Sequence, residues 1–410
     1  MIPQPTDRLH YRDALASREL RVLLGAQLVS VVGLSIAAVA LTVRVYRQTA
    51  SPLLASLTFA LSFLPYVLGG AFLSGLVDRL PPRRLVAVCN SGSALLIAAI
   101  ASPGLPLPVL FALLLGSGML SSVSSGARAT LVRACVPADA YVPARSLFRI
   151  VAQLAQIGGN AGGGALLVIL SPNVTLLVSA GAFALSALTV RIGIHDHRPA
   201  GAHSGDPLLK DSLRGARQVL AHPELRRLML FGWLTSMFIV APEALAAPYV
   251  AQHHAAPALV GWWLVALPIG LITGDFAGVR LLGASQQRRL VAPAAAVGFL
   301  PYLAFAADPP IAVAMALLVV SGVCGFSSLG LDARMRDAAP QELFGRTMTV
   351  YTAGMMALQG FGFALAGAIG QAVGPATAVA IAGCCGLAAT IGLLRGDLRI
   401  LVIAGGQRTP

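Results

Sequence analysis

Long apolar runs separated by short polar turns dominate this sequence. One run covers residues 53–77, and a cationic turn separates it from the next run at 85–102. A helix needs about 20 apolar residues to cross a bilayer, so runs of this length predict transmembrane helices. We expect twelve of them, at residues 21–43, 53–77, 85–102, 107–126, 147–170, 173–191, 228–250, 258–280, 290–307, 310–330, 348–372 and 376–394.

The cationic turn between the second and third runs recurs in the second half of the chain. Arg83–Ala87 is repeated as Arg288–Ala292, 205 residues later, which is half of the 410-residue length. Other pairs keep nearly the same spacing, among them Gly159 with Gly362. We therefore predict two parallel six-helix halves related by an axis along the membrane normal. The expected order is an N-terminal bundle at 1–191, a cytoplasmic linker at 192–224, and a C-terminal bundle with a short cytoplasmic tail at 225–410.

Composition supports an all-α membrane protein. The chain is 57% hydrophobic and only 11% charged, whereas soluble domains carry about 25% charged residues. The net charge of +13 is confined to one side of the expected spans, because Arg44 and Arg47 alone fall on the other side. Positive residues remain cytoplasmic, so we expect both termini inside the plasma membrane. A charge distributed in this way argues for a lipid bilayer as partner and against nucleic acid.

Motifs for catalysis or metal binding are missing from the sequence. All seven His residues lie in polar segments, and the five Cys residues show no metal-ligand spacing. No P-loop, His-Glu-x-x-His or Gly-x-Ser-x-Gly pattern occurs. We expect neither an enzyme nor a metal or cofactor site. Without a nucleotide-binding motif, we do not expect this chain by itself to use ATP.

The turn Gly75–Ala87 resembles the signature loop of the major facilitator superfamily, between its second and third helices. That loop follows the pattern G-x-x-x-D-R-x-G-R-R, and here Pro82 stands where glycine is usual. The matching residues, whose spacing departs from the pattern by one residue, are Gly75, Asp78, Arg79, Arg83 and Arg84.

This resemblance implies a secondary transporter that works by alternating access. It also implies a gating role for the loop and for its copy at Arg288 and Arg289. Asp78 would hold the cytoplasmic side shut beside the start of the eleventh helix, where the helix dipole favours a carboxylate. The alternative is that the arginines only set the topology.

Further segments resemble the superfamily's proton-driven drug, macrolide and siderophore exporters. They are Gln27–Gly33 with Ser51-Pro52, Ala127–Pro137 with Ala144–Leu147, and Pro340–Arg346. The resemblance implies proton-coupled efflux of a small amphipathic drug or natural product, and we expect a monomer. A metabolite uptake or export permease of the same fold and a non-transporting membrane sensor are the alternatives.

Three features depart from the exporters and drug antiporters. Leu34 follows the matching glycine, Gly33, where relatives often carry an acid. Asn160 replaces the proline of their fifth-helix signature. The fourth apolar run, 107–126, contains no arginine, although some drug antiporters carry one there.

Two carboxylic acids lie inside the expected spans and are the candidate proton carriers. Glu243 follows Pro242 in the seventh span, and Asp275 lies in the eighth. Acids within a bilayer are costly and generally functional. For Glu243 the alternatives are a substrate contact, an ion pair with Arg44, or a side chain that reaches outward to water. For Asp275 the alternative is an ion pair with Arg280.

Polar residues inside the spans form the candidate substrate cavity. Spacings of three and four residues place them on shared helical faces. Interhelical hydrogen bonds, at about 1 kcal/mol each, are the alternative use. The candidates are Gln27, Ser30, Gln153, Gln156, Asn160 and Gln359.

A small-residue face is also evident in the eighth span, where glycine recurs at every fourth position. Gly270, Gly274 and Gly278 form this face, and such faces allow close approach of two helices. By the resemblance, we expect it to meet the fifth helix.

Overall fold

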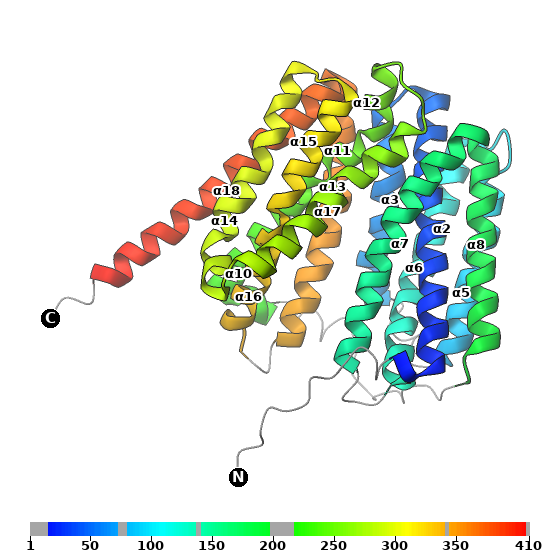
Figure 1. Cartoon of the computed structure of the whole chain (residues 1–410), viewed down its shortest axis with the longest axis horizontal. Coiled ribbons are helices and arrows are strands. Elements are labelled where there is room, and N and C mark those ends of the chain that lie inside the picture. The colour runs from blue at the N-terminus through cyan, green and yellow to red at the C-terminus, as the bar shows by residue number, and fades with distance from the viewer. Residues whose placement is uncertain (1–14, 73–79, 137–140, 197–216, 341–343, 407–410) are drawn as a thin grey trace, which may run out of the picture. The chain divides into compact units, whose positions relative to one another are not determined.

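The computed structural model describes residues 15–72, 80–136, 141–196, 217–340 and 344–406, and these parts are built mainly from long helices (Figure 1). The helices are α2 (Arg18–Thr49), α3 (Pro52–Phe72), α5 (Pro82–Ile100), α6 (Leu107–Cys135), α7 (Tyr141–Ile169), α8 (Pro172–Gly193), α10 (Pro223–Ile239), α11 (Ala241–Ala244), α12 (Ala246–Gln252), α13 (Leu259–Leu281), α14 (Ala284–Leu303), η1 (Ala304–Ala307), α15 (Ile311–Val323), η2 (Cys324–Phe326), α16 (Ser327–Ala338), α17 (Phe344–Val373) and α18 (Pro375–Gly406). Over the described residues, ten spans are long and apolar enough to cross a membrane, which confirms the all-α membrane class. The total of twelve crossings remains a prediction.

Prolines mark several helix starts. Pro82, Pro172 and Pro223 occupy first-turn positions, where the missing N–H is not needed and the fixed φ suits a helix. Before Pro172, the Ser171 hydroxyl accepts a hydrogen bond from the backbone N–H of Val174 at 3.4 Å. Proline and serine therefore mark where these helices begin. The helices start within about six residues of the starts of the predicted spans.

The chain forms two compact units. Unit 1 contains residues 1–40 and 68–205, and unit 2 contains 41–67 and 206–410. Spatial contact rather than chain order defines these units, so the predicted sequence of bundle, linker and bundle remains a prediction.

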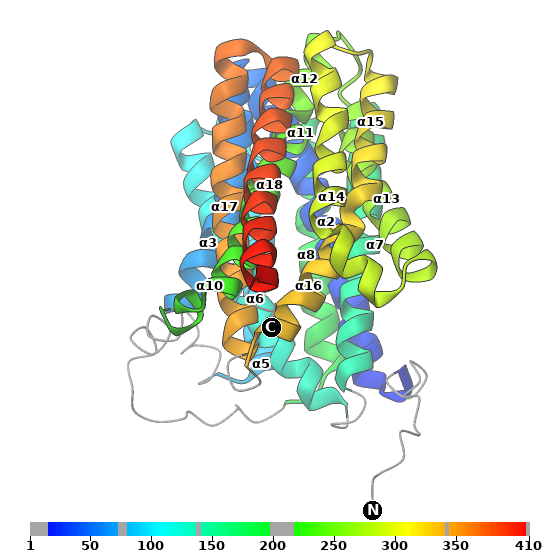
Figure 2. The same ribbon diagram turned by 90° about the vertical axis from the view of Figure 1, so that its left-hand side faces the viewer.

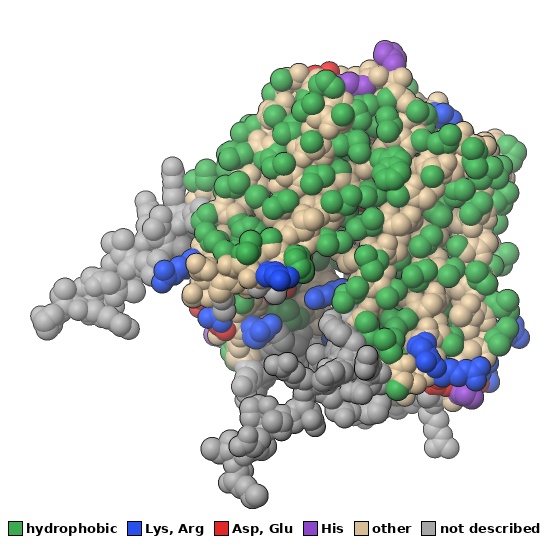
Figure 3. Space-filling model, viewed as in Figure 1, with side chains coloured by type: hydrophobic (Ala, Val, Ile, Leu, Met, Phe, Trp, Pro, Cys, Tyr) green, Lys and Arg blue, Asp and Glu red, His purple; other side chains and the backbone are tan. Residues whose placement is uncertain are grey.

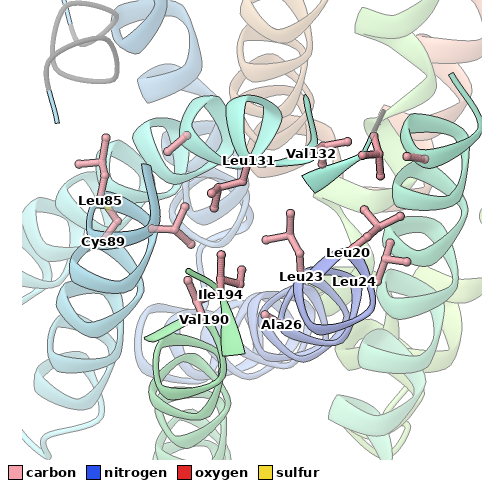
Figure 4. Close-up of a cluster of buried hydrophobic side chains, with 14 of the residues drawn as sticks. Leu20, Leu23, Leu24, Ala26, Leu85, Cys89, Leu131, Val132, Val190 and Ile194 are labelled. Carbon is pink, nitrogen blue, oxygen red and sulfur yellow. The ribbon is translucent and has the colours of Figure 1, made fainter. Parts of the chain in front are cut away.

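A core of buried apolar side chains joins the helices of unit 1. Leu23 from α2 and Leu131 from α6 are fully buried, and Ile194, just after α8, is 3% exposed. Figure 4 shows these three side chains pointing toward a common centre, with Leu85 and Cys89 of α5 alongside. This core sets the relative positions of α2, α5, α6 and α8, and with them the polar groups described below.

The internal duplication recurs in the packing. In unit 1, a Cβ atom on Gly159 of α7 would meet the Val32 carbonyl of α2 at 2.8 Å. In unit 2, a Cβ atom on Gly362 of α17 would overlap the Met237 carbonyl of α10. Gly362 lies 203 residues after Gly159, and Met237 lies 205 residues after Val32. The two matched glycines thus make the same kind of close helix contact in each unit, which agrees with a duplicated architecture.

Residues 41–67 pack within unit 2, against α17. The Thr42 and Thr58 hydroxyls hydrogen-bond at 3.0 Å and join the end of α2 to α3. Phe59 stacks on Phe363 of α17 with ring centroids 5.1 Å apart. One turn further along α17, a Cβ atom on Gly367 would overlap the Ser56 hydroxyl, so this contact requires glycine.

The glycine face of α13 packs against α15. Side chains at Gly270 and Gly274 would overlap the carbonyls of Val319 and Val323. The expectation of close helix approach is confirmed, and within unit 2 the partner of these glycines is α15. A contact between α13 and the fifth helix remains a prediction. The spacing of small residues predicts a close contact and carries no information about the helix that fills it.

The surfaces of the two units suit a bilayer. In each unit, hydrophobic side chains cover most of the face visible in Figure 3, while Lys and Arg gather at one end. Exposed apolar residues include Leu95 at 72% and Ile169 at 77% of their full exposure. In unit 2, α17 and α18 run side by side (Figure 2). Apolar sides with charged ends are expected where lipid contacts the helix flanks.

Candidate functional site

The helix that carries Glu243 is broken at that position. Helix α10 ends at Ile239, the four-residue α11 contains Glu243, and α12 begins at Ala246. Pro242 causes the break, because proline donates no hydrogen bond and its ring clashes with the carbonyl four residues earlier. The Glu243 side chain is half-buried on this short turn.

Two backbone carbonyls that precede Glu243, by four residues and by one residue, accept hydrogen bonds from aromatic side chains. The Tyr302 hydroxyl on α14 donates to the Ile239 carbonyl at 2.9 Å. The indole Nε1 of Trp263 on α13 donates to the Pro242 carbonyl at 2.8 Å. Both aromatic side chains are almost fully buried.

Four buried rings form what we call the aromatic frame: Tyr249, Trp263, Tyr302 and Phe305. Trp263 lies 4.7 Å from Tyr249 and 6.1 Å from Phe305, measured between ring centroids. Tyr302 lies 6.4 Å from Phe305 in an edge-on arrangement. The Tyr249 hydroxyl donates to the Pro309 carbonyl at 2.6 Å.

The ion pair with Arg44, one of the alternatives for Glu243, is not formed. The structure describes both Glu243 and Arg44, and no ion pair joins them. Asp275 is half-buried on α13, and Arg280 lies over the Phe276 ring at 5.8 Å from its centroid. The proton-carrying roles predicted for Glu243 and Asp275 remain predictions.

A buried polar network crosses four helices of unit 1. Arg128 of α6 donates to the Gln27 side-chain oxygen of α2 and, at 3.1 Å, to the Asn90 side-chain oxygen of α5. The Asn90 amide donates to the Ser186 hydroxyl of α8 at 3.0 Å. Ser124 donates to Asn90 at 3.2 Å.

Helix α6 is longer than the fourth apolar run, 107–126, which contains no arginine. Helix α6 continues past residue 126 to Cys135 and therefore carries Arg128 and Arg133. The helix continues because Ala127 and Leu131 are fully buried in the core of unit 1.

The other cavity candidates differ in exposure. Ser30 is buried and donates to the Gln27 backbone carbonyl at 3.1 Å, within its own helix. Gln153 and Gln156 are exposed on α7, whereas Asn160 on the same helix is buried. Gln359 is half-buried on α17 of unit 2. Their role as substrate contacts remains a prediction.

The candidate gating arginines form ion pairs at the ends of both units. Arg83 and Arg84 lie 3.1 and 3.3 Å from the Asp196 carboxylate, just beyond α8. Arg288 lies 3.2 Å from Asp337, and Arg289 is exposed. Gly75, Asp78 and Arg79 lie outside the described residues.

Sequence reasoning missed Asn90, Arg128, Trp263 and Tyr302. Asn90 could have been noticed because it is a polar residue inside an expected span. Pro242 could have pointed to Trp263 and Tyr302, because a proline within a helix leaves backbone carbonyls that need other donors. Both signals were available in the sequence. The partners that complete each group lie on other helices.

Membrane-length helices, a duplicated helix contact and a half-buried carboxylate at a broken helix are features of secondary transporters. The profile of the Major Facilitator Superfamily matches residues 23–243, which is more than half of the 410 residues. The chain belongs to this superfamily, so it is a membrane transporter of small molecules and not an enzyme.

Curated relatives align along most of the chain. The multidrug efflux pump Tap of Mycolicibacterium fortuitum is 27% identical over 374 residues, covering 87% of this chain and 90% of Tap. The enterobactin exporter EntS of Shigella dysenteriae serotype 1 is 24% identical, covering 88% of each chain.

Solved transporters share the fold. The nucleoside transporter NupG superposes with a TM-score of 0.75 at 13% identity, covering 92% of this chain and 99% of NupG. A bacterial homolog of the human lysosomal transporter Spinster gives a TM-score of 0.70, also at 13% identity, covering 92% and 95%. At such identities the likeness concerns the fold alone.

Proposed function

We propose that this transporter exports small amphipathic compounds, such as drugs or natural products, in exchange for protons. The observation that carries the proposal is the half-buried Glu243 carboxylate on a broken helix. Among the described residues it forms no ion pair, so a proton can neutralise it without leaving a buried cation behind. The similarity to Tap and EntS supports the outward direction.

The energetics of this exchange are adequate. One proton moving down 100 mV releases about 2.3 kcal/mol. At about 1.4 kcal/mol per decade, that supports a substrate gradient of roughly fifty-fold. Proton binding at Glu243 would remove the charge that is costly inside the bilayer and so permit the step that reorients the site.

Alternating access would come from rocking of the two six-helix halves. The positive ends of both units would face the cytoplasm, which places both termini inside. Arg83, Arg84, Arg288 and Arg289 would act at this cytoplasmic side, and the polar candidates of α2, α7 and α17 would contact substrate. The transporter would work as a monomer.

The test uses the full-length protein in inside-out proteoliposomes with ethidium as the probe. An imposed pH gradient should drive ethidium accumulation, and Glu243→Gln should abolish the dependence on that gradient. Glu224→Gln is the matched control, because Glu224 lies exposed in the first turn of α10. Asp275→Asn tests the second carboxylate in the same assay.

Each alternative gives a different result. Flux that ignores the pH gradient in the wild type would indicate a permease, and no flux of any tested compound would favour a sensor. Loss of coupling in Asp275→Asn alone would transfer the proton-carrying role to Asp275. If Glu243→Gln keeps the wild-type response to the gradient, the role of Glu243 is refuted.

A further inference from the structure

Hydrogen bonding at the break in the seventh span differs from that of a continuous helix. In an α-helix, the Ile239 carbonyl would accept from residue 243 and the Pro242 carbonyl from residue 246. Inside a bilayer, a backbone carbonyl without a donor costs several kcal/mol. Tyr302 and Trp263 donate to these two carbonyls, and so satisfy the backbone of the turn that leads into Glu243.

The two donors belong to different helices and have little freedom to move. Trp263 on α13 is 1% exposed, and Tyr302 on α14 is fully buried. Their rings pack against the other members of the aromatic frame, Tyr249 and Phe305. The frame therefore fixes the turn that carries Glu243 relative to α13 and α14.

The Glu243 carboxylate depends on this arrangement for its own position. Among the described residues, no ion pair or side-chain hydrogen bond holds it. Its location is thus set by the backbone of α11, and that backbone is held by the two aromatic donors. A functional group displaced by about 1 Å loses much of its effect, with losses of the order of a hundredfold in enzymes.

We propose that Trp263 and Tyr302 are positioning residues that hold the broken turn in place and thereby keep Glu243 where it acts in transport. This inference rests on the proposed function of Glu243. The residues act through the backbone carbonyls of Ile239 and Pro242, and neither needs to touch substrate.

The test uses Tyr302→Phe in the full-length protein, because this change removes one oxygen atom and leaves the ring in the frame. Tyr249→Phe is the matched control, since its hydroxyl donates to the Pro309 carbonyl and not to the turn. Trp263→Phe is the second variant. If it fails to fold, Tyr302→Phe alone decides the result.

The first measurement is backbone hydrogen–deuterium exchange over residues 240–246, which needs no substrate. We expect about tenfold faster exchange in Tyr302→Phe and Trp263→Phe, because loss of one buried hydrogen bond is worth about one decade. Tyr249→Phe should exchange at the wild-type rate in this segment. Wild-type exchange in both donor variants would overturn the inference.

The second measurement is a double-mutant cycle for ethidium transport. We expect Tyr302→Phe to lower kcat about tenfold with little change in KM, and to have no further effect once Glu243→Gln is present. An equal loss in both backgrounds, or a loss confined to KM, would show a merely structural role and overturn the inference.

The two proposals fail in different ways. Glu243→Gln alone decides whether Glu243 couples transport to protons. The cycle decides whether Tyr302 acts through Glu243. Suppose that Glu243→Gln abolishes proton coupling and that Tyr302→Phe lowers transport equally with and without Glu243→Gln. The proposed function would then stand, and the positioning role of Tyr302 would be refuted.

Discussion

Replacing Asn90 by alanine should destabilise unit 1 more than truncating either serine of its polar network, Ser124 or Ser186. Asn90 is 2% exposed, donates to Ser186, and accepts from Ser124 and Arg128. Interhelical hydrogen bonds in membrane proteins average about 0.6 kcal/mol, and bonds to a charged group reach about 1.5–3 kcal/mol. Two neutral bonds and one charged bond together give a loss of roughly 2–4 kcal/mol.

Thermal melting of the purified protein in detergent measures this loss. Units of about this size shift by ~2–4 °C per kcal/mol, so we expect Tm to fall by about 4–16 °C. Ser30→Ala is the matched control, because Ser30 is equally buried but donates only within its own helix. Asn90→Asp should lose less than Asn90→Ala, since it keeps both acceptor contacts and gives up the donation to Ser186.

Transport provides a second check on the network. Arg128 holds the Gln27 side chain, so loss of Asn90 should also lower ethidium transport by disturbing that candidate cavity residue. A melting temperature for Asn90→Ala within about 1 °C of Ser30→Ala would refute the additive reasoning. In that case the helices would be held by apolar packing alone.

Two further changes test packing and charge. Gly274→Ala should lower stability by about 1–3 kcal/mol, because its Cβ would overlap the Val323 carbonyl. Gly158→Ala is the control: it has open space around it and should melt like the wild type. Asp196→Asn removes the exposed ion pairs with Arg83 and Arg84, so the free energy of unfolding should fall by no more than about 1 kcal/mol. In 1 M salt, the variant and the wild type should melt at the same temperature.

Much of the helical layout was predictable because lipid imposes a simple rule. The run 173–191 appears as α8, Pro172–Gly193, since a spanning segment must be continuous, apolar and internally hydrogen-bonded. The duplication was predictable from the glycines. Equivalent helices in the two halves need small residues where they pack closely, so glycines recur at equivalent positions. Gly159 and Gly362 have this role in the two units.

The polar groups of the candidate site were less predictable because their partners are distant in the sequence. Arg128 bonds to Gln27 and Asn90 at separations of 101 and 38 residues. Tyr302 reaches Ile239 across 63 residues. Local patterns identify a polar residue or a proline as unusual, but only the packed structure selects the group that satisfies it.

The contrast between the two embedded charges links this chemistry to transport. Arg128 donates hydrogen bonds to side chains of two other helices. Such a charge stabilises the bundle, because its removal would leave those acceptors without a donor. Glu243 sits on a broken helix and, among the described residues, is held only through its backbone. A carboxylate that must gain and lose a proton has to avoid a permanent cationic partner, which would favour its charged form throughout the cycle. For the proton-carrying role proposed for Glu243, a firmly held turn beneath a carboxylate without an ion pair would supply both a fixed position and freedom to change charge.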